Sequence, residues 1–379
     1  MHRTHRDLFL CLGCGLLGIF VPQLALGQEK SEQVEVFFKT SPKTVKRFVV
    51  RETNKEVEFT KGYTIPAANI EDIDYRNYFS LQDQSRQIYS TARNLEAEAK
   101  KAKTLKQRHE HLQNAISKYK DVQEKLAANP KSLVLKKAPR HVQFKVAYIT
   151  GLLGIGQNNR TRQIEAIFAL ENFKKKHGTN IWQYTLMVEM LVKLQTTLGY
   201  YDKAEAVVTE LIGLKLATKV TNGVQIFFYE ELMKAGKHAT TLPKLSKLVA
   251  ALPKGTDIRI RARLAEAQCT AATKKIDAAV EKVKAILNET KNNRFRGKAY
   301  NTLGLCYFES KDYQKAVWPF LWVDVIYNHD KEEHAKAMYY LWKSFKELGE
   351  LDRAQRFYNS LRSDSQFVGT EYQRLAESD

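Results

Sequence analysis

The chain has 379 residues, of which 44% are hydrophobic and 27% are charged. This length suits a small module joined to an extended array, and the hydrophobic share is enough to bury a sizeable core, which excludes a wholly disordered chain. Lys and Arg number 61 against 42 Asp and Glu, so the formal net charge is +19, and anionic partners are favoured by long-range attraction.

The first 27 residues have the layout of a secretory signal peptide. Two arginines in MHRTHR precede the apolar run LFLCLGCGLLGIFV, and small residues stand at Ala25 and Gly27. Cleavage is therefore expected before Gln28. The alternative is an uncleaved anchor, because Leu8 to Leu26 is nearly long enough to span a bilayer. No later stretch is that apolar, so we expect the mature chain to be periplasmic or extracellular, with no integral membrane span.

Residues 28–78 show the pattern of short strands. VEVFF, TVKRFVV, EVEFT and YTIPAANIEDIDY are rich in β-branched and aromatic residues, and SPK, TNK and KGY separate them as turns. In EVEFT, Val57 and Phe59 alternate with polar residues, which predicts one buried face and one solvated face. The segment resembles the small SH3-like or Sm-like β-modules of exported bacterial proteins, so we expect a meander of four or five antiparallel strands.

Helical periodicity replaces the strand pattern in residues 79–379. The stretch LGLCYFESKDYQKAVWPF places small residues at Gly304 and Ala316, with Tyr307 and Phe320 at the large positions. This spacing resembles the tetratricopeptide repeat (TPR). In that family the two small residues mark the point where paired helices cross closely, and the large residues fill the space around it.

The same frame returns in the segment that follows, AMYYLWKSFKELGELDRAQRFY, with Gly349 in the turn and Ala354 in the second helix. The match is clearest over residues 295–363 and fainter upstream. Extending the repeat length of about 34 residues to the upstream helices gives about seven hairpins. The predicted fold is therefore mostly α, a TPR-like solenoid preceded by a small antiparallel β-module, and the resemblance implies that first helices line its concave side.

Candidate ligand-binding residues lie on three successive first helices. Arg261, Lys298 and Lys336 each stand six residues before the small or equivalent position, which in the repeat family tends to face the groove. By the same resemblance, Asn301 and Tyr339 point into this groove. The alternative is chance, since Lys and Arg are abundant in the chain, and the pattern differs from the two-Lys, two-Asn carboxylate clamp of some family members.

No motif in the sequence indicates a reaction. The histidines in HEH and HDKEEH lack the H-E-x-x-H spacing of zinc proteases, and GLLGIGQ ends a helix instead of following a strand, which we interpret as a loose helix end. No G-x-S-x-G nucleophile elbow is present. Cys269 and Cys306 are expected to be buried thiols in adjacent repeats, too far apart for a disulfide. We therefore expect no catalytic site, metal or cofactor.

These patterns predict a non-enzymatic, exported scaffold that binds protein partners in the bacterial cell envelope. The alternative is a binder of anionic polymer, such as phosphate-bearing glycan, lipid headgroups or nucleic acid, through a basic concave surface. The charge of the groove separates the two hypotheses. A basic wall favours the anionic polymer, whereas an apolar wall with scattered charge favours protein.

Overall fold

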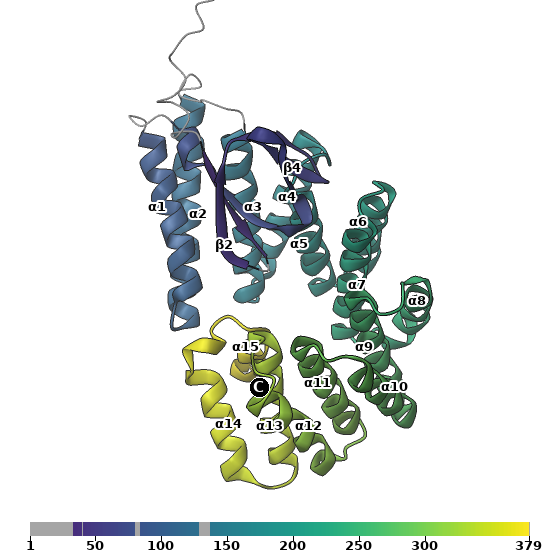
Figure 1. The fold of residues 1–379 in the computed structure, drawn as a ribbon. Coiled ribbons are helices and arrows are strands. Elements are labelled where there is room, and N and C mark those ends of the chain that lie inside the picture. The colour runs from purple at the N-terminus through teal and green to yellow at the C-terminus, as the bar shows by residue number, and fades with distance from the viewer. Residues whose placement is uncertain (1–32, 40, 80–83, 129–136, 379) are drawn as a thin grey trace, which may run out of the picture.

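The computed structural model describes residues 33–39, 41–79, 84–128 and 137–378 (Figure 1). The expected signal peptide and its cleavage position lie outside these residues. The described chain is a helical repeat array with two small antiparallel sheets on its N-terminal side, as predicted. No described helix is long and apolar enough to cross a membrane.

Within the described residues the β-module has six strands, not four or five, and they form two three-stranded sheets in the order β2-β1-β6 and β3-β4-β5. The single meander expected is therefore wrong, because β1 pairs with both β2 and β6. YTIPAANIEDIDY also splits into two strands, since a 3-10 turn (Ala67–Asn69) follows Pro66. The strands are β1 (Val34–Phe38), β2 (Ser41–Arg47), β3 (Val49–Glu52), β4 (Glu56–Phe59), β5 (Tyr63–Pro66) and β6 (Ile70–Asp74).

Seven helical hairpins and a short final helix follow within the described residues, each hairpin formed by two consecutive helices. The pairs are α1 (Gln84–Lys101) with α2 (Leu105–Ala128), α3 (Lys137–Gly156) with α4 (Arg160–His177), α5 (Tyr184–Thr197) with α6 (Tyr201–Gly213), α7 (Thr218–Lys234) with α8 (His238–Ala251), α9 (Asp257–Ala272) with α10 (Ile276–Glu289), α11 (Asn293–Glu309) with α12 (Tyr313–Val325), and α13 (Lys331–Glu347) with α14 (Leu351–Ser363). The final helix is α15 (Glu371–Ser378).

The turn and cap residues explain where several of these helices begin and end. Asp330 caps α13, because its carboxylate accepts hydrogen bonds from the backbone N–H groups of the first turn. Asn292 caps α11 and Asp312 caps α12 in the same way. Gly349 separates α13 from α14 with φ at +77°, a left-handed conformation that glycine adopts without a Cβ clash.

The crossing of α11 and α12 depends on Gly304. A Cβ at this position would lie 2.6 Å from the ring of Phe320, which is fully buried. Ala316 is also fully buried at this interface, whereas Tyr307 is half-buried beside it. The equivalent residue of α13 is Trp342, which instead packs its ring against Tyr358 of α14 at 4.8 Å.

The glycines of GLLGIGQ lie at tight helix contacts, so their interpretation as a loose helix end is wrong. A Cβ on Gly154 of α3 would lie 2.9 Å from the backbone nitrogen of Gln163 in α4. A Cβ on Gly151 would meet the sulfur of Met190 in α5 at the same distance. Three consecutive helices can therefore approach closely only because these positions have no side chain.

The hairpins curve so that the C-terminal end returns toward the first helices (Figure 1). Lys234 of α7 forms an ion pair with Glu371 of α15 at 2.6 Å, although the two are far apart in the sequence. Arg108 of α2 lies against Gly369, just before α15. The array therefore encloses a central space, and residues from both of its ends face that space.

Candidate functional site

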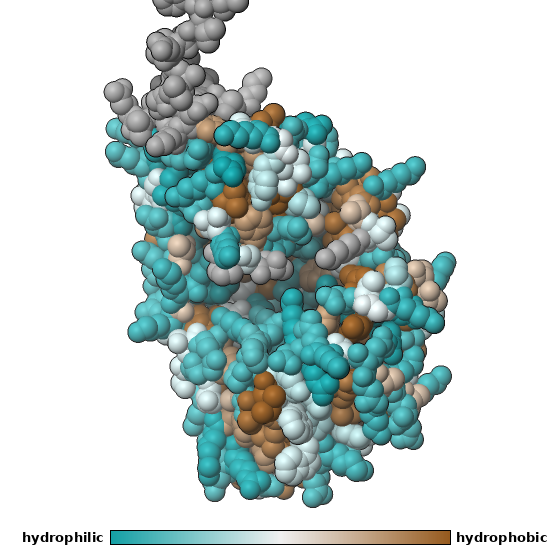
Figure 2. Space-filling view, in the orientation of Figure 1, coloured by the Kyte–Doolittle hydropathy of each residue, from teal (hydrophilic) through white to brown (hydrophobic). Residues whose placement is uncertain are grey.

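A central cavity of about 630 Å³ lies within the curve of the array. Its wall comes mainly from first helices of the hairpins (α3, α5, α7, α9, α11 and α13), joined by α2, the start of α8 and α15, and no lining residue comes from α10, α12 or α14. Figure 2, which is drawn in the orientation of Figure 1, shows that this face of the molecule is largely hydrophilic and is hollowed near its centre. Most of the lining helices are first helices, as expected, but α2 and α8 are second helices, and the first helix α1 contributes no lining residue.

Charges of both signs line this cavity in nearly equal number. The seven cations are Arg108, Lys193, Lys234, Arg261, Lys298, Lys336 and Arg374, and the six carboxylates are Glu230, Glu231, Glu309, Glu332, Glu333 and Glu371. Aliphatic and aromatic side chains, among them Leu264, Leu305 and Tyr340, lie between them. The described wall is therefore a mixed surface and not a basic stripe.

Arg261, Lys298 and Lys336 all lie on this wall, but the first two face carboxylates of the chain itself. Arg261 donates from Nε to Glu230 at 2.9 Å, and Lys298 Nζ lies 3.5 Å from Glu333. The spacing that placed these residues together in the sequence did not reveal their partners, which come from neighbouring helices.

Lys336 differs from the other two because no carboxylate of the described residues forms an ion pair with its ammonium group. Nζ lies 6.0 Å from the centre of the Tyr372 ring, a cation–π contact at the edge of the useful range. Burial lowers the pKa of Lys336, and Lys234 and Lys298 add to this, while Glu333 opposes it. Glu371 also opposes the effect of burial, so two carboxylates act on Lys336 although neither forms a direct ion pair with it in the described chain.

Glu333 lies between Lys298, Lys336 and Asn301, and all three act on its carboxylate. Burial would raise its pKa, but Lys336 and Lys298 outweigh burial and keep it below the ordinary value. Asn301 donates to Glu333 twice, to the backbone oxygen and to Oε2, both at 2.8 Å. The acid is therefore ionised and held in place by three side chains.

Asn301 and Tyr339 do not line the cavity, contrary to the expectation that they point into the groove. Asn301 is fully buried between α11 and α13, where its side-chain amide donates to Glu333 of the neighbouring helix. Tyr339 is buried among the rings of Tyr340, Trp342 and Tyr372. Both residues pack against side chains that line the cavity, Asn301 against Glu333 and Tyr339 against Tyr340 and Tyr372.

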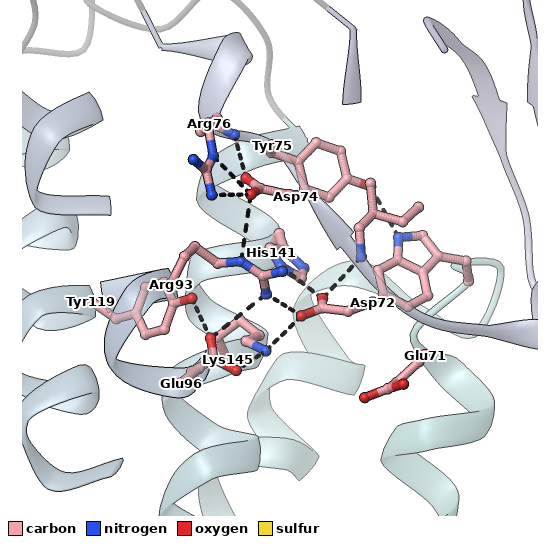
Figure 3. A network of polar contacts seen from close by, with 12 residues as sticks. Glu71, Asp72, Asp74, Tyr75, Arg76, Arg93, Glu96, Tyr119, His141 and Lys145 are labelled. Atoms are coloured by element: carbon pink, nitrogen blue, oxygen red, sulfur yellow. Dashed lines mark hydrogen bonds and ion pairs between the residues drawn. The ribbon is translucent and has the colours of Figure 1, made fainter. Parts of the chain in front are cut away.

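A second charged cluster is buried where the β-module meets α1, α2 and α3 (Figure 3). Asp72 of β6 accepts hydrogen bonds from Arg93 of α1 and from Lys145 of α3, the latter at 2.9 Å. His141 Nε2 lies 3.3 Å from the same carboxylate. Glu96 pairs with Lys145 and accepts a hydrogen bond from Tyr119 of α2.

Burial and opposite charges set the ionisation of this cluster. Burial would raise the pKa of Asp72, but Arg93 and Lys145 outweigh it and hold the pKa well below its usual value. Burial would lower the pKa of Lys145, yet Asp72 and Glu96 raise it. His141 is the exception, since burial lowers its pKa despite Asp72. The cluster therefore holds ionised acids and bases that join the sheet to three helices.

The sequence reasoning missed both this cluster and the residues that α15 brings to the cavity. Asp72 and Asp74 alternate with apolar residues in β6, a pattern that predicts a solvent-exposed strand face. In the structure both aspartates are buried. Only the contact of β6 with distant helices reveals their partners.

The remaining sequence candidates make local contacts. His334 Nε2 lies 2.7 Å from Asp324, and His111 Nδ1 lies 3.4 Å from Glu98. Cys269 and Cys306 are both free and fully buried. Among the residues that the structure describes, no group of three or more His, Cys, Asp or Glu is arranged to hold a metal ion.

Comparison with known proteins places this chain near helical repeat structures of low identity. No family profile and no curated protein matches it. A tetratricopeptide repeat protein from Parabacteroides merdae is 16% identical, with a TM-score of 0.45 over 77% of this chain and 99% of that one. PilW, a widely conserved type IV pilus biogenesis factor, is 16% identical, with a TM-score of 0.38 over 61% and 98% of the two chains. The TPR domain of P58(IPK) is 15% identical, with a TM-score of 0.26 over 71% and 66%.

Proposed function

We propose that this chain is a non-enzymatic scaffold that holds a segment of a partner protein in its central cavity. The observation that carries the proposal is the cavity wall, which is built by first helices and mixes near-balanced charges with apolar side chains. A peptide offers both charges and apolar side chains, so such a wall can match it. The site is assembled from several hairpins, which suits an extended segment.

The second candidate, a binder of anionic polymer, needs a wall of one sign. The net charge of +19 favours it at long range, but the carboxylates of the cavity offset the cations there. We therefore place the protein partner first.

The cell envelope is the proposed place of action, outside the cytoplasm. This part of the proposal rests on the signal-like residues 1–27, with cleavage near Gly27 and Gln28.

Lys336 is the residue through which the proposal is best tested. It lines the cavity without an ion pair, so Lys336→Gln removes a ligand contact and breaks no salt bridge of the described chain. Reversing Arg261 or Lys298 to Glu would instead place two carboxylates face to face and disturb the fold. Lys346→Gln on the same helix is the matched control, because Lys346 is exposed and away from the cavity.

The experiment compares partners captured from an envelope extract by the wild type, Lys336→Gln and Lys346→Gln. We expect the wild type and the control to capture one set of proteins, and Lys336→Gln to capture them more weakly while it remains folded. Between about 50 and 200 mM salt, a polymer held by several phosphate contacts would lose about 10³–10⁵ in affinity, whereas a protein held by buried contacts loses much less. Equal capture by all three baits would contradict the assignment of the cavity.

A further inference from the structure

Two arginines from opposite ends of the array line the central cavity and lie near enough for the charge of one to act on the other. Arg108 lies on α2 and Arg374 on α15, and both line the cavity. Arg108 packs over the backbone at Gly369, where a Cβ would lie 2.5 Å from Nη1. Gly369 has φ at +78°, a backbone conformation that favours glycine. Because glycine has no side chain, the guanidinium group of Arg108 can occupy the space beside it.

Neither arginine has an ion pair within the described residues, although both are partly buried. Nε of Arg374 is buried without any hydrogen-bond partner. A buried guanidinium N–H that makes no hydrogen bond is costly, and in folded proteins such groups are nearly always satisfied. This donor and the paired positive charges indicate that a group is missing from the site.

The surroundings of the two arginines are also basic. Burial lowers the pKa of Arg108, and Arg374 lowers it further, while Glu332 opposes both. Burial, Arg108, Arg374 and Arg162 together lower the pKa of His109. A bound anion would relieve this mutual repulsion.

Two acids at this edge, Glu332 and Glu371, act on the arginines electrostatically but form no ion pair with them within the described residues. Glu332 acts on Arg108 without forming an ion pair, and burial raises its own pKa. Glu371 is already paired with Lys234. Lys331 adds another cation near Arg108, and its Nζ donates to the backbone oxygen of Val368 at 2.7 Å.

We infer that Arg108 and Arg374 together bind a phosphate group at this edge of the cavity. Guanidinium groups match the oxygens of phosphate with paired hydrogen bonds, and two of them suit a doubly charged anion better than a single carboxylate. The bound group would join α2 to α15 and so link the two ends of the array. This site goes beyond the scaffold role and does not depend on it.

The test measures binding of inorganic phosphate and of phosphoserine to the full chain by calorimetry and by melting temperature. The variants are Arg108→Gln and Arg374→Gln. Arg353→Gln is the matched control, because Arg353 is an exposed arginine on α14 whose Nη1 lies 2.7 Å from Glu350. Acetate at the same ionic strength controls for salt and for single carboxylates.

We expect saturable phosphate binding by the wild type and by Arg353→Gln, and affinity at least about tenfold lower in each of the other variants. Without anion, Arg108→Gln and Arg374→Gln should melt at the same or a higher temperature, because each removes an uncompensated charge. Phosphoserine binding as tightly as inorganic phosphate would identify a phosphomonoester as the ligand, and binding of inorganic phosphate alone would identify the free anion.

Three results would overturn the inference. The first is an absence of saturable phosphate binding by the wild type, and the second is equal binding by all variants. The third is a lower melting temperature, or failure to fold, of both glutamine variants without anion, which would show that the two arginines serve the fold.

Discussion

Gly304 is the residue on which the best-matching repeat depends. Its missing side chain lets the ring of Phe320 reach the backbone of α11. The two residues belong to one hairpin, so their spacing in the sequence was enough to predict the contact.

Replacing Gly304 with Leu should destabilise the protein by about 1–3 kcal/mol, because the added side chain overpacks the crossing. Gly223→Ala is the control, since Gly223 lies inside α7 with nothing within 4 Å of a Cβ there. That change should be neutral or stabilising by up to about 1 kcal/mol, because alanine is the better helix former. Denaturant unfolding measures both variants, and a Gly304→Leu protein as stable as the wild type would remove Gly304 from the interface.

Cys269 and Cys306 should be unreactive in the native protein. Burial raises the pKa of each thiol to about 12, so the reactive thiolate is scarce at pH 8. Alkylation followed by digestion and mass spectrometry should label neither residue until denaturant unfolds the chain. Rapid labelling of the folded protein at either position would show that its helix opens locally.

At the residue scale, the sequence located the cavity cations but not their partners. Arg261, Lys298 and Lys336 share one position of a repeating helix, and a repeat is visible in a sequence. Glu230 and Glu333 occupy no such shared position, and Arg374 reaches Arg108 only because the array curves. Charge pairing between distant helices leaves no local pattern, so these three cations predicted a more basic surface than the cavity has.

At the scale of elements, the β-module is joined to the helices by the buried charges around Asp72. This carboxylate receives Arg93 from α1 and Lys145 from α3, while His141 lies beside it. Removing an acid between two buried cations leaves their charges uncompensated, and this is the costly way to break a buried ion pair.

Asp72→Asn should therefore destabilise the protein by about 3–5 kcal/mol, measured by denaturant unfolding. Glu58→Gln on β4 is the control, because Glu58 pairs with the exposed Arg51 at 3.1 Å. An exposed pair is worth about 1 kcal/mol or less. Equal, small effects of both changes would mean that the cluster adds nothing to docking of the sheets.

The same carboxylate gives a pH dependence with a definite sign. The pKa of Asp72 is depressed in the folded state relative to 3.8, so its contribution is complete above pH 3.8 and is lost as the pH falls through the folded value. Below pH 4, the free energy of unfolding should fall more steeply in the wild type than in Asp72→Asn. Parallel acid profiles of the two proteins would show that Asp72 is not ionised in the fold.

Most elements were predictable, because helical periodicity and turn residues are local. The hairpins follow from the repeat, and Val57 and Phe59 of β4 are buried as their alternation predicts. The pairing of β1 with β6 was not predictable, since it joins the two ends of the β-module and no hairpin turn connects them. Burial of Asp72 and Asp74 was hidden for the same reason.

At the scale of the whole molecule, the curvature of the array converts separate hairpins into one enclosed site. Helices as far apart in the sequence as α2 and α15 contribute residues to the cavity wall. An ion pair between Lys234 and Glu371 joins α7 to α15 beside the cavity. The cavity therefore exists only in the complete array.

N-terminal sequencing of the exported protein tests the predicted cellular location. If residues 1–27 are a signal peptide, sequencing should begin at or near Gln28. An intact leader on the exported protein would instead make it membrane-anchored by the run from Leu8 to Leu26.

Site-specific photo-crosslinking tests the central claim most directly. A photoreactive residue at Leu305 lies on the cavity wall, and one at Gln314 in the same hairpin is exposed and away from the cavity. A partner held in the cavity should give a covalent adduct from position 305 and none from position 314, and Lys336→Gln should reduce that adduct. Adducts from position 314 alone, or equal adducts from both positions, would contradict binding inside the cavity.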